Sequence, residues 1–135
     1  MEQPVRILER LLVERGIDPT TRGEDIGFLH MSHSGTFKGQ AQADAESTSV
    51  EFWLRHDPRG EDGKAELQAK LERVNQNPIM MESSGRWMRF LYTKDHLGFV
   101  GRLNQKGAPL DEEVARLRLG SLIELMESKL PGLTT

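Results

Sequence analysis

Cysteine is absent from this chain of 135 residues, and the chain also lacks long apolar runs and clusters of basic residues. Without cysteine, disulfides, thiolate nucleophiles and cysteine-ligated zinc sites are excluded. No apolar run approaches the ~20 residues that a helix needs to cross a bilayer. The first residues also lack the basic and apolar regions of a signal peptide, so we expect a cytoplasmic protein without a membrane segment.

Basic residues are outnumbered by acidic ones, 18 to 21, which leaves a formal net charge of −3 at pH 7. Proteins that bind nucleic acid through its phosphates normally carry a basic stripe, so this balance argues against a general nucleic-acid binder. Charged residues make up 29% of the chain and hydrophobic residues 36%, as in ordinary globular proteins. We therefore expect one folded domain over residues 1–135, long enough to bury roughly two-thirds of its unfolded surface.

Three amphipathic stretches predict helices over residues 4–15, 63–75 and 111–130. Asp62 and Asp111 stand where the N-caps of the second and third helices are expected. Gly120 lies inside the last helix, where glycine costs ~1 kcal/mol relative to alanine. We therefore expect another group of the protein to pack close to Gly120.

Two clusters of short alternating runs lie between these helices. The first cluster, over about 25–57, contains three strands, of which the run from Val50 to Arg55 alternates most clearly. The second cluster, over about 79–103, contains two or three strands, and two glycines weaken the last of them. This order of elements, α-βββ-α-ββ(β)-α, predicts an α+β fold in which helices pack on a mostly antiparallel twisted sheet.

Aromatic and arginine side chains alternate with the apolar side chains of the predicted strands. If the apolar set faces the helices, the following residues point away from them: Trp53, Arg55, Trp87, Arg89 and Leu91. Tryptophan and arginine are enriched at the centres of protein interfaces, so these five residues form a candidate partner-binding surface. The alternative is a sheet that is covered on both faces, with both tryptophans in the core.

Histidines offer a second interpretation, a small enzyme with a site around His30, His33 and His56 at one end of the sheet. A metal site is not expected, because His30 and His33 diverge on an extended backbone and no HExxH pattern occurs. His56 and His96 each adjoin an aspartate in a predicted loop, where acid and base are often neighbours by chance. We predict no cofactor.

The remaining chemical signatures are weak. Ser32 and Ser34 lack the leading glycine and the strand–turn–helix setting of a hydrolase nucleophile. No glycine-rich loop precedes a helix, so no phosphate cradle is expected. A third hypothesis is a module for single-stranded nucleic acid, in which Trp87 stacks on a base and Arg89 pairs with the backbone.

The order of elements resembles that of bacterial type III secretion chaperones and of the related YbjN-like family. The segment from Leu67 to Asn75, in which a leucine pair precedes an asparagine, is similar to the middle helix of such proteins. The resemblance implies a small homodimer without enzymatic activity. Its sheet and helix surfaces would hold an extended segment of a partner protein, which gives our leading hypothesis of a chaperone-like or regulatory binding protein.

Overall fold

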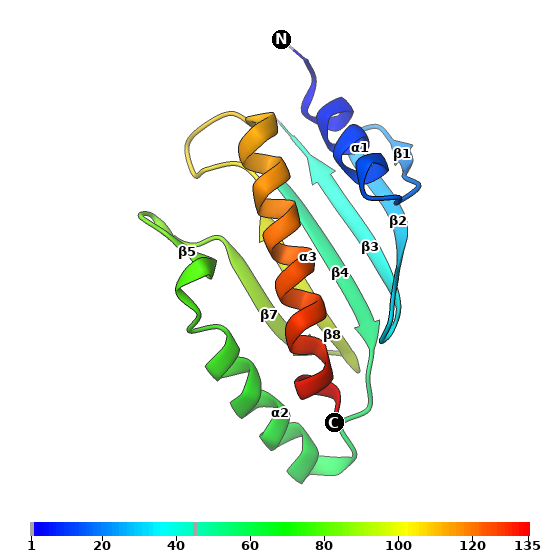
Figure 1. The fold of residues 1–135 in the computed structure, drawn as a ribbon, viewed down its shortest axis with the longest axis vertical. Helices are drawn as coiled ribbons and strands as arrows, with labels where there is room; N and C mark the ends of the chain where they lie inside the picture. Colours follow the sequence, from blue (N-terminus) through cyan, green and yellow to red (C-terminus); the bar gives the residue numbers. More distant parts are fainter. Residues whose placement is uncertain (1, 45) are drawn as a thin grey trace.

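Three helices pack on one face of a six-stranded antiparallel sheet in the computed structural model, which describes residues 2–44 and 46–135 (Figure 1). The helices are α1 (Pro4–Glu14), α2 (Gly60–Val74) and α3 (Glu112–Thr134), with a 3₁₀ turn, η1 (Pro78–Met80). The strands of the sheet are β1 (Thr20–Arg22), β2 (Asp25–Ser32), β3 (Gly35–Ala43), β4 (Thr48–Arg55), β7 (Met88–Thr93) and β8 (His96–Arg102). A separate small hairpin contains β5 (Met81–Glu82) and β6 (Gly85–Arg86). The predicted α+β fold is confirmed.

The strands follow the order β1-β2-β3-β4-β8-β7, and every neighbouring pair is antiparallel. The chain forms a four-stranded meander, crosses through α2, and returns as the β7–β8 hairpin, in which β8 pairs with β4. Lys94 and Asp95 form the two-residue turn of this hairpin with φ angles of 51° and 63°. Positive φ at both turn positions matches the twist of the two strands.

Phenylalanines from five strands form the centre of the core beneath the helices. Phe52 of β4 lies opposite Phe99 of β8, and the ring of Phe99 meets that of Phe90 edge to face at 4.7 Å. Gly39 leaves room for Phe28 on β2, because a Cβ at residue 39 would lie 2.0 Å from the Phe28 ring. The predicted apolar stripes of the helices complete this core, through Leu8 and Leu12, Leu67 and Leu71, and Leu119, Leu122 and Met126.

Two helix boundaries differ from the prediction. Helix α2 begins at Gly60, after Arg59 with a φ of 64°, so Asp62 lies in the first turn and is not the N-cap. Helix α3 continues through Pro131 to Thr134, because Leu133 is buried and holds the last turn on the core. Asp111 does cap α3, since its side chain accepts a hydrogen bond from the backbone of Val114.

The two edges of the sheet differ in the hydrogen-bond partners of their backbone groups. At the β7 edge, the side-chain amide of Asn75 donates to the carbonyl of Phe90 at 2.7 Å and accepts from its N–H at 2.8 Å. At the other edge, β1 pairs with β2 only at Asp25–Gly27. Within residues 2–44 and 46–135, the outer side of β2 from 28 to 32 therefore has no strand partner.

Among the described residues, none of the helices combines sufficient length with sufficient apolar character to cross a bilayer.

Candidate binding surface on the open sheet face

Within residues 2–44 and 46–135, the face of the sheet opposite the helices is uncovered. Along β3, the side chains of Phe37, Ala41 and Ala43 are buried under the helices, whereas those between them are exposed. We call the uncovered side the open face, and Figure 1 shows α1 and α3 lying across the other side. The strand alternation therefore separates an apolar core face from a polar face that meets solvent.

Trp53 lies near the middle of the open face, on β4, and its side chain is half-buried. The ring covers Gly98 on β8, where a Cβ would lie 2.4 Å from ring atom Cζ3. The indole N–H donates to Glu51 Oε1 at 2.8 Å, and the amide of Gln40 donates to the same oxygen at 3.1 Å. Gly98 beneath the ring and Glu51 beside it therefore hold the indole against the sheet.

Basic side chains surround Trp53. Lys38 lies opposite Trp53 on β3, Arg55 follows it by two residues on β4, and Arg89 lies on β7 across β8. Lys94 lies in the neighbouring β7–β8 turn. All four are exposed, and within the described part of the chain none of them forms an ion pair. The open face therefore carries uncompensated positive charge in a protein whose net charge is −3.

Two shallow hollows flank Trp53, and the tryptophan lines both. The first has a volume of about 730 Å³ and lies among Lys38, Arg55 and Lys94, and we call it the lysine–arginine hollow. The second has a volume of about 650 Å³ and lies beside Glu51, Arg89 and Leu91. Both are open to solvent and large enough to receive side chains of an extended segment.

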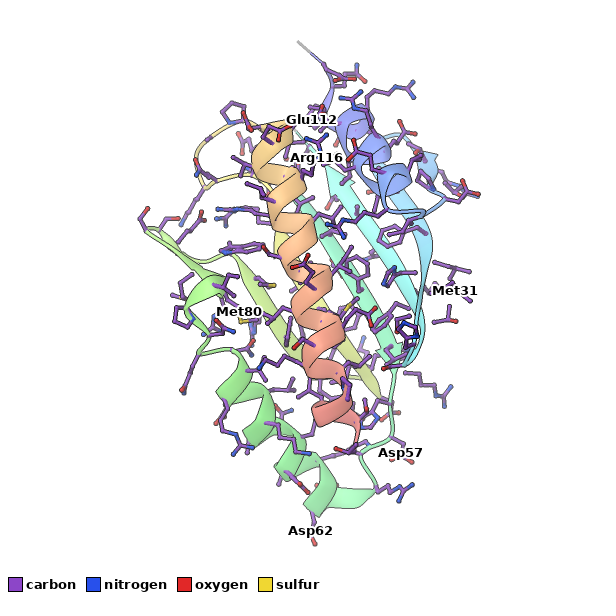
Figure 2. The ribbon with its side chains drawn as sticks, in the orientation of Figure 1. Met31, Asp57, Asp62, Met80, Glu112 and Arg116 are labelled. Atoms are coloured by element: carbon purple, nitrogen blue, oxygen red, sulfur yellow. The ribbon has the colours of Figure 1, made fainter. Side chains whose placement is uncertain are left out.

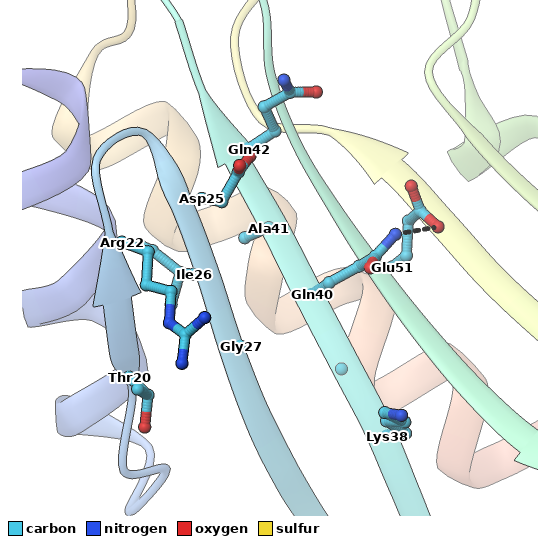
Figure 3. Close-up of a pocket in the computed structure, with 11 residues that line it drawn as sticks. Thr20, Arg22, Asp25, Ile26, Gly27, Lys38, Gln40, Ala41, Gln42 and Glu51 are labelled. Atoms are coloured by element: carbon cyan, nitrogen blue, oxygen red, sulfur yellow. Dashed lines mark hydrogen bonds between the residues drawn. The ribbon is translucent and has the colours of Figure 1, made fainter.

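A third hollow of about 460 Å³ continues the open face toward β1 (Figure 3). Small residues at Gly27, Gly39 and Ala41 form part of its lining, with Arg22 and Gln40 among the polar side chains around them. The hydrogen bond from Gln40 to Glu51 separates this hollow from the Trp53 region. The open face therefore carries three hollows along its length.

Trp87 borders the second hollow, but its ring is buried on the side of α3 and does not point away from the helices as expected. Only 8% of its surface is exposed, its indole N–H donates to the carbonyl of Ile79 at 2.8 Å, and the Arg118 guanidinium lies 4.8 Å from the ring centroid. Trp87 lies in the bend between β6 and β7 and not in the strand ladder. Strand alternation therefore does not determine where this ring points. The structure brings the other four predicted residues, Trp53, Arg55, Arg89 and Leu91, onto the open face.

A cluster of opposite charges near Trp87 attaches the β5–β6 hairpin to the sheet. Glu82 of the hairpin forms ion pairs with Arg102 of β8 and Arg118 of α3. Burial lowers the pKa of both guanidinium groups, although each stays charged. In this cluster each guanidinium has a carboxylate partner, unlike the lysines and arginines around Trp53.

The three histidines of the enzyme hypothesis occupy different surroundings. His30 lies on the helix side, where its Nε2 is 3.2 Å from Glu127 Oε1 and its ring lies between Phe37 and Phe52. His33 lies exposed in the β2–β3 turn, and His56 lies after β4. Among the described residues, no hydrogen bond joins these side chains and no group of three potential metal ligands converges.

Lys38 and Lys94 were not among the predicted surface residues. The signal for Lys38 is its place in the β3 alternation, between inward-facing Phe37 and Gly39. Its contribution depends on β3 pairing with β4 next to Trp53, and that pairing is a tertiary contact. For Lys94, the proximity follows from β8 pairing with β4, which brings the β7–β8 turn beside Arg55.

The chain matches no protein-family model and no curated protein sequence. Its fold is similar to that in the crystal structure of YbjN, "a putative transcription regulator from E. coli", with a TM-score of 0.61 and 12% sequence identity. The similarity covers 91% of this chain and 85% of the YbjN chain. At this level of identity the likeness concerns the fold alone, so the chain has a YbjN-like fold.

Proposed function

We propose that this chain is a non-enzymatic, chaperone-like or regulatory binding protein that holds a segment of a partner protein on its open face. The observation that supports this proposal is the half-buried Trp53, which lies between two hollows and among exposed cations without ion-pair partners. A soluble protein seldom leaves such a combination uncovered without a binding role.

The residue types favour protein recognition. Tryptophan and arginine contribute most of the binding energy at many interfaces, because they bury a large area with few rotatable bonds or make several hydrogen bonds. Leu91 adds an apolar contact beside Arg89 on the same face. The description of YbjN as a putative transcription regulator agrees with a binding role.

We also propose that the protein is a homodimer in the cytoplasm. The support for self-association is the outer edge of β2, where Leu29 is 62% exposed and Met31 is 74% exposed, and Figure 2 shows Met31 at the margin of the molecule. A strand with a free edge pairs readily with a second copy of itself in antiparallel orientation, and the result has two-fold symmetry.

To test partner binding, peptides are selected from a random 12-residue phage-displayed library against the immobilised wild-type protein. Synthetic copies of the enriched peptides are then titrated against the wild type, Trp53→Ala and the control Leu117→Ala, which removes an exposed side chain from α3. We expect Trp53→Ala to bind at least about tenfold more weakly with its circular dichroism unchanged, because a central anchor is lost. Enriched peptides that bind Trp53→Ala as well as the wild type would overturn the proposal, and so would a failure to enrich any peptide.

The experiment for self-association is light scattering coupled to size-exclusion chromatography across a dilution series. We expect a dimer for the wild type and for Leu117→Lys, and a monomer for Met31→Lys, because a charge at the edge opposes strand pairing. A wild-type monomer at every concentration would refute the homodimer. A Met31→Lys dimer would refute the β2 edge as its interface.

A further inference from the structure

We propose that the segment held on the open face is acidic, and that its carboxylates bind in the lysine–arginine hollow beside Trp53. This inference rests on the proposed function and specifies the chemistry of the partner. It assigns the ionic contacts to Lys38, Arg55 and Lys94, and the apolar contact to the exposed side of the Trp53 ring.

The charged residues that line the lysine–arginine hollow, Lys38, Arg55 and Lys94, are all positive. Its remaining lining residues are neutral or histidine: Thr36, Gly39, Gln40, Trp53, Thr93 and His96. Among the described residues, no carboxylate lines it. An anionic side chain entering the hollow would therefore meet several hydrogen-bond donors and cations and no like charge.

Some cations elsewhere on the molecule have carboxylate partners within the chain. Arg10 of α1 contacts Glu2 and Glu112, and Arg116 of α3 contacts Glu14 and Glu112. The side chains of Lys38 and Arg55 have no such contacts within the described part of the chain, although they lie on regular strands. A partner that supplies carboxylates would complete these ion pairs.

The spacing of the cations suits an extended segment. Lys38 and Trp53 are directly opposed on adjacent strands, and neighbouring strands are about 4.8 Å apart. Arg55 follows Trp53 by two residues, which corresponds to about 6.6 Å along the strand. Side chains on one side of an extended peptide recur at the same interval of about 6.6 Å. Alternate residues of the peptide therefore reach Arg55 and the Trp53 ring together.

The open face favours an acidic protein segment over nucleic acid. Leu29 and Met31 are largely exposed on β2, and Leu91 lies beyond Trp53, so apolar surface extends to both sides of the cations. Glu51 lies beside Trp53 at the border of the second hollow. Its carboxylate would repel a phosphate backbone that runs across both hollows, whereas a peptide can place its carboxylates in the lysine–arginine hollow alone. An acidic segment with intervening apolar residues matches both the cations and the apolar surface.

The test repeats the peptide selection on wild type, on the double variant Lys38→Gln/Arg55→Gln, and on Arg73→Gln/Lys129→Gln. The last variant is a matched control, because it removes two exposed positive charges from α2 and α3. The selected peptides are titrated by tryptophan fluorescence at 50 mM and 500 mM NaCl. A single-stranded dT12 oligonucleotide is titrated in parallel.

We expect wild type and control to select peptides rich in Asp and Glu with at least one apolar residue. Binding of these peptides should fall about tenfold in Lys38→Gln/Arg55→Gln and should weaken in high salt, because partly exposed ion pairs are screened. Neutral or basic peptides that depend on Trp53 would overturn the inference and leave the proposed function intact. Acidic peptides that bind the double variant with undiminished affinity would also overturn it, as would dT12 binding more tightly than every peptide. Peptides that ignore Trp53 would refute the proposed function itself.

Discussion

The indole ring of Trp53 rests directly on Gly98, where even a methyl group would lie 2.4 Å from ring atom Cζ3. The ring keeps its place because β8 presents no side chain at that position. Two residues that are 45 positions apart in the sequence thus build one feature of the open face, and the β4–β8 pairing brings them together.

The first prediction concerns Gly98→Ala, which should lift the Trp53 ring from the sheet. Gly98 is buried beneath the ring, so the added methyl group displaces packed apolar surface, and we expect the free energy of unfolding to fall by about 1–3 kcal/mol. Tryptophan emission should shift to the red, because the indole gains contact with water. The same substitution in a Trp53→Phe background serves as the control, since only buried Trp87 then reports. An unchanged emission spectrum in the Trp53-containing protein would contradict this placement of the ring.

The second prediction concerns Asn75→Ala at the β7 edge. Both backbone groups of Phe90 lose their partner, so we expect the free energy of unfolding to fall by about 1–3 kcal/mol in urea titrations. The exposed edge should also promote aggregation, measurable by light scattering during refolding. Gln76→Ala changes the next, exposed residue and should leave both quantities unchanged. Equal stability of Asn75→Ala and wild type would show that Asn75 does not protect the edge.

The third prediction concerns Gly120 in α3. The expected close neighbour exists, because a Cβ at this position would lie 2.4 Å from Nη2 of Arg15. That atom is the end of a flexible, exposed side chain, so it moves away at little cost. Gly120→Ala should therefore stabilise the protein by up to about 1 kcal/mol in urea or thermal unfolding, through its higher helix propensity. A loss of stability would mean that the position of Arg15 is rigidly held.

The fourth prediction concerns pH. A hydrogen bond from Arg116 lowers the pKa of Glu14, and hydrogen bonds from Arg10 and then Arg116 lower the pKa of Glu112, from an ordinary value of 4.5. A carboxylate with a lowered pKa stabilises the folded state above its unfolded pKa and loses that effect as the pH falls through the folded pKa. Stability should therefore decrease as the pH drops below about 4.5, by a modest amount because these groups are exposed.

Arg116→Gln tests this origin of the acid sensitivity. We expect a smaller difference in Tm between pH 7 and pH 3 than in the wild type, because Glu14 and Glu112, whose pKa values Arg116 lowers, lose that partner. Figure 2 shows Arg116 and Glu112 where α3 meets α1. Arg73→Gln, on α2, should retain the wild-type difference. Identical pH profiles for wild type and Arg116→Gln would exclude these ion pairs as a source of the acid sensitivity.

Much of the fold follows from local sequence patterns. The alternation of Val50 to Arg55 and the apolar stripes of the helices depend on residues near one another in the chain, so they predict strands and helices correctly. The three-residue strand β1 is too short for alternation to reveal it. The expectation of one domain over residues 1–135 stays a prediction, and a single cooperative unfolding transition would support it.

The sequence predicts the residues of the candidate surface less completely than it predicts the fold. Trp53, Arg55, Arg89 and Leu91 follow from alternation, because they lie within strands. Trp87 was misplaced, because the bend that precedes β7 turns its ring into the core. The grouping of cations around Trp53 depends on the order of strands in the sheet, and local patterns carry no information on that order.

Binding of an acidic segment on the open face is tested most directly by mapping amide chemical-shift changes in the protein during titration with an acidic peptide from the selection. We predict that the largest changes cluster at Lys38, Trp53, Arg55 and Gly98, together with the indole N–H of Trp53. The amides of α1 and α3 should move little, because they lie on the covered side of the sheet. Changes centred on the helices, with the Trp53 indole signal unmoved, would contradict the open face as the binding surface.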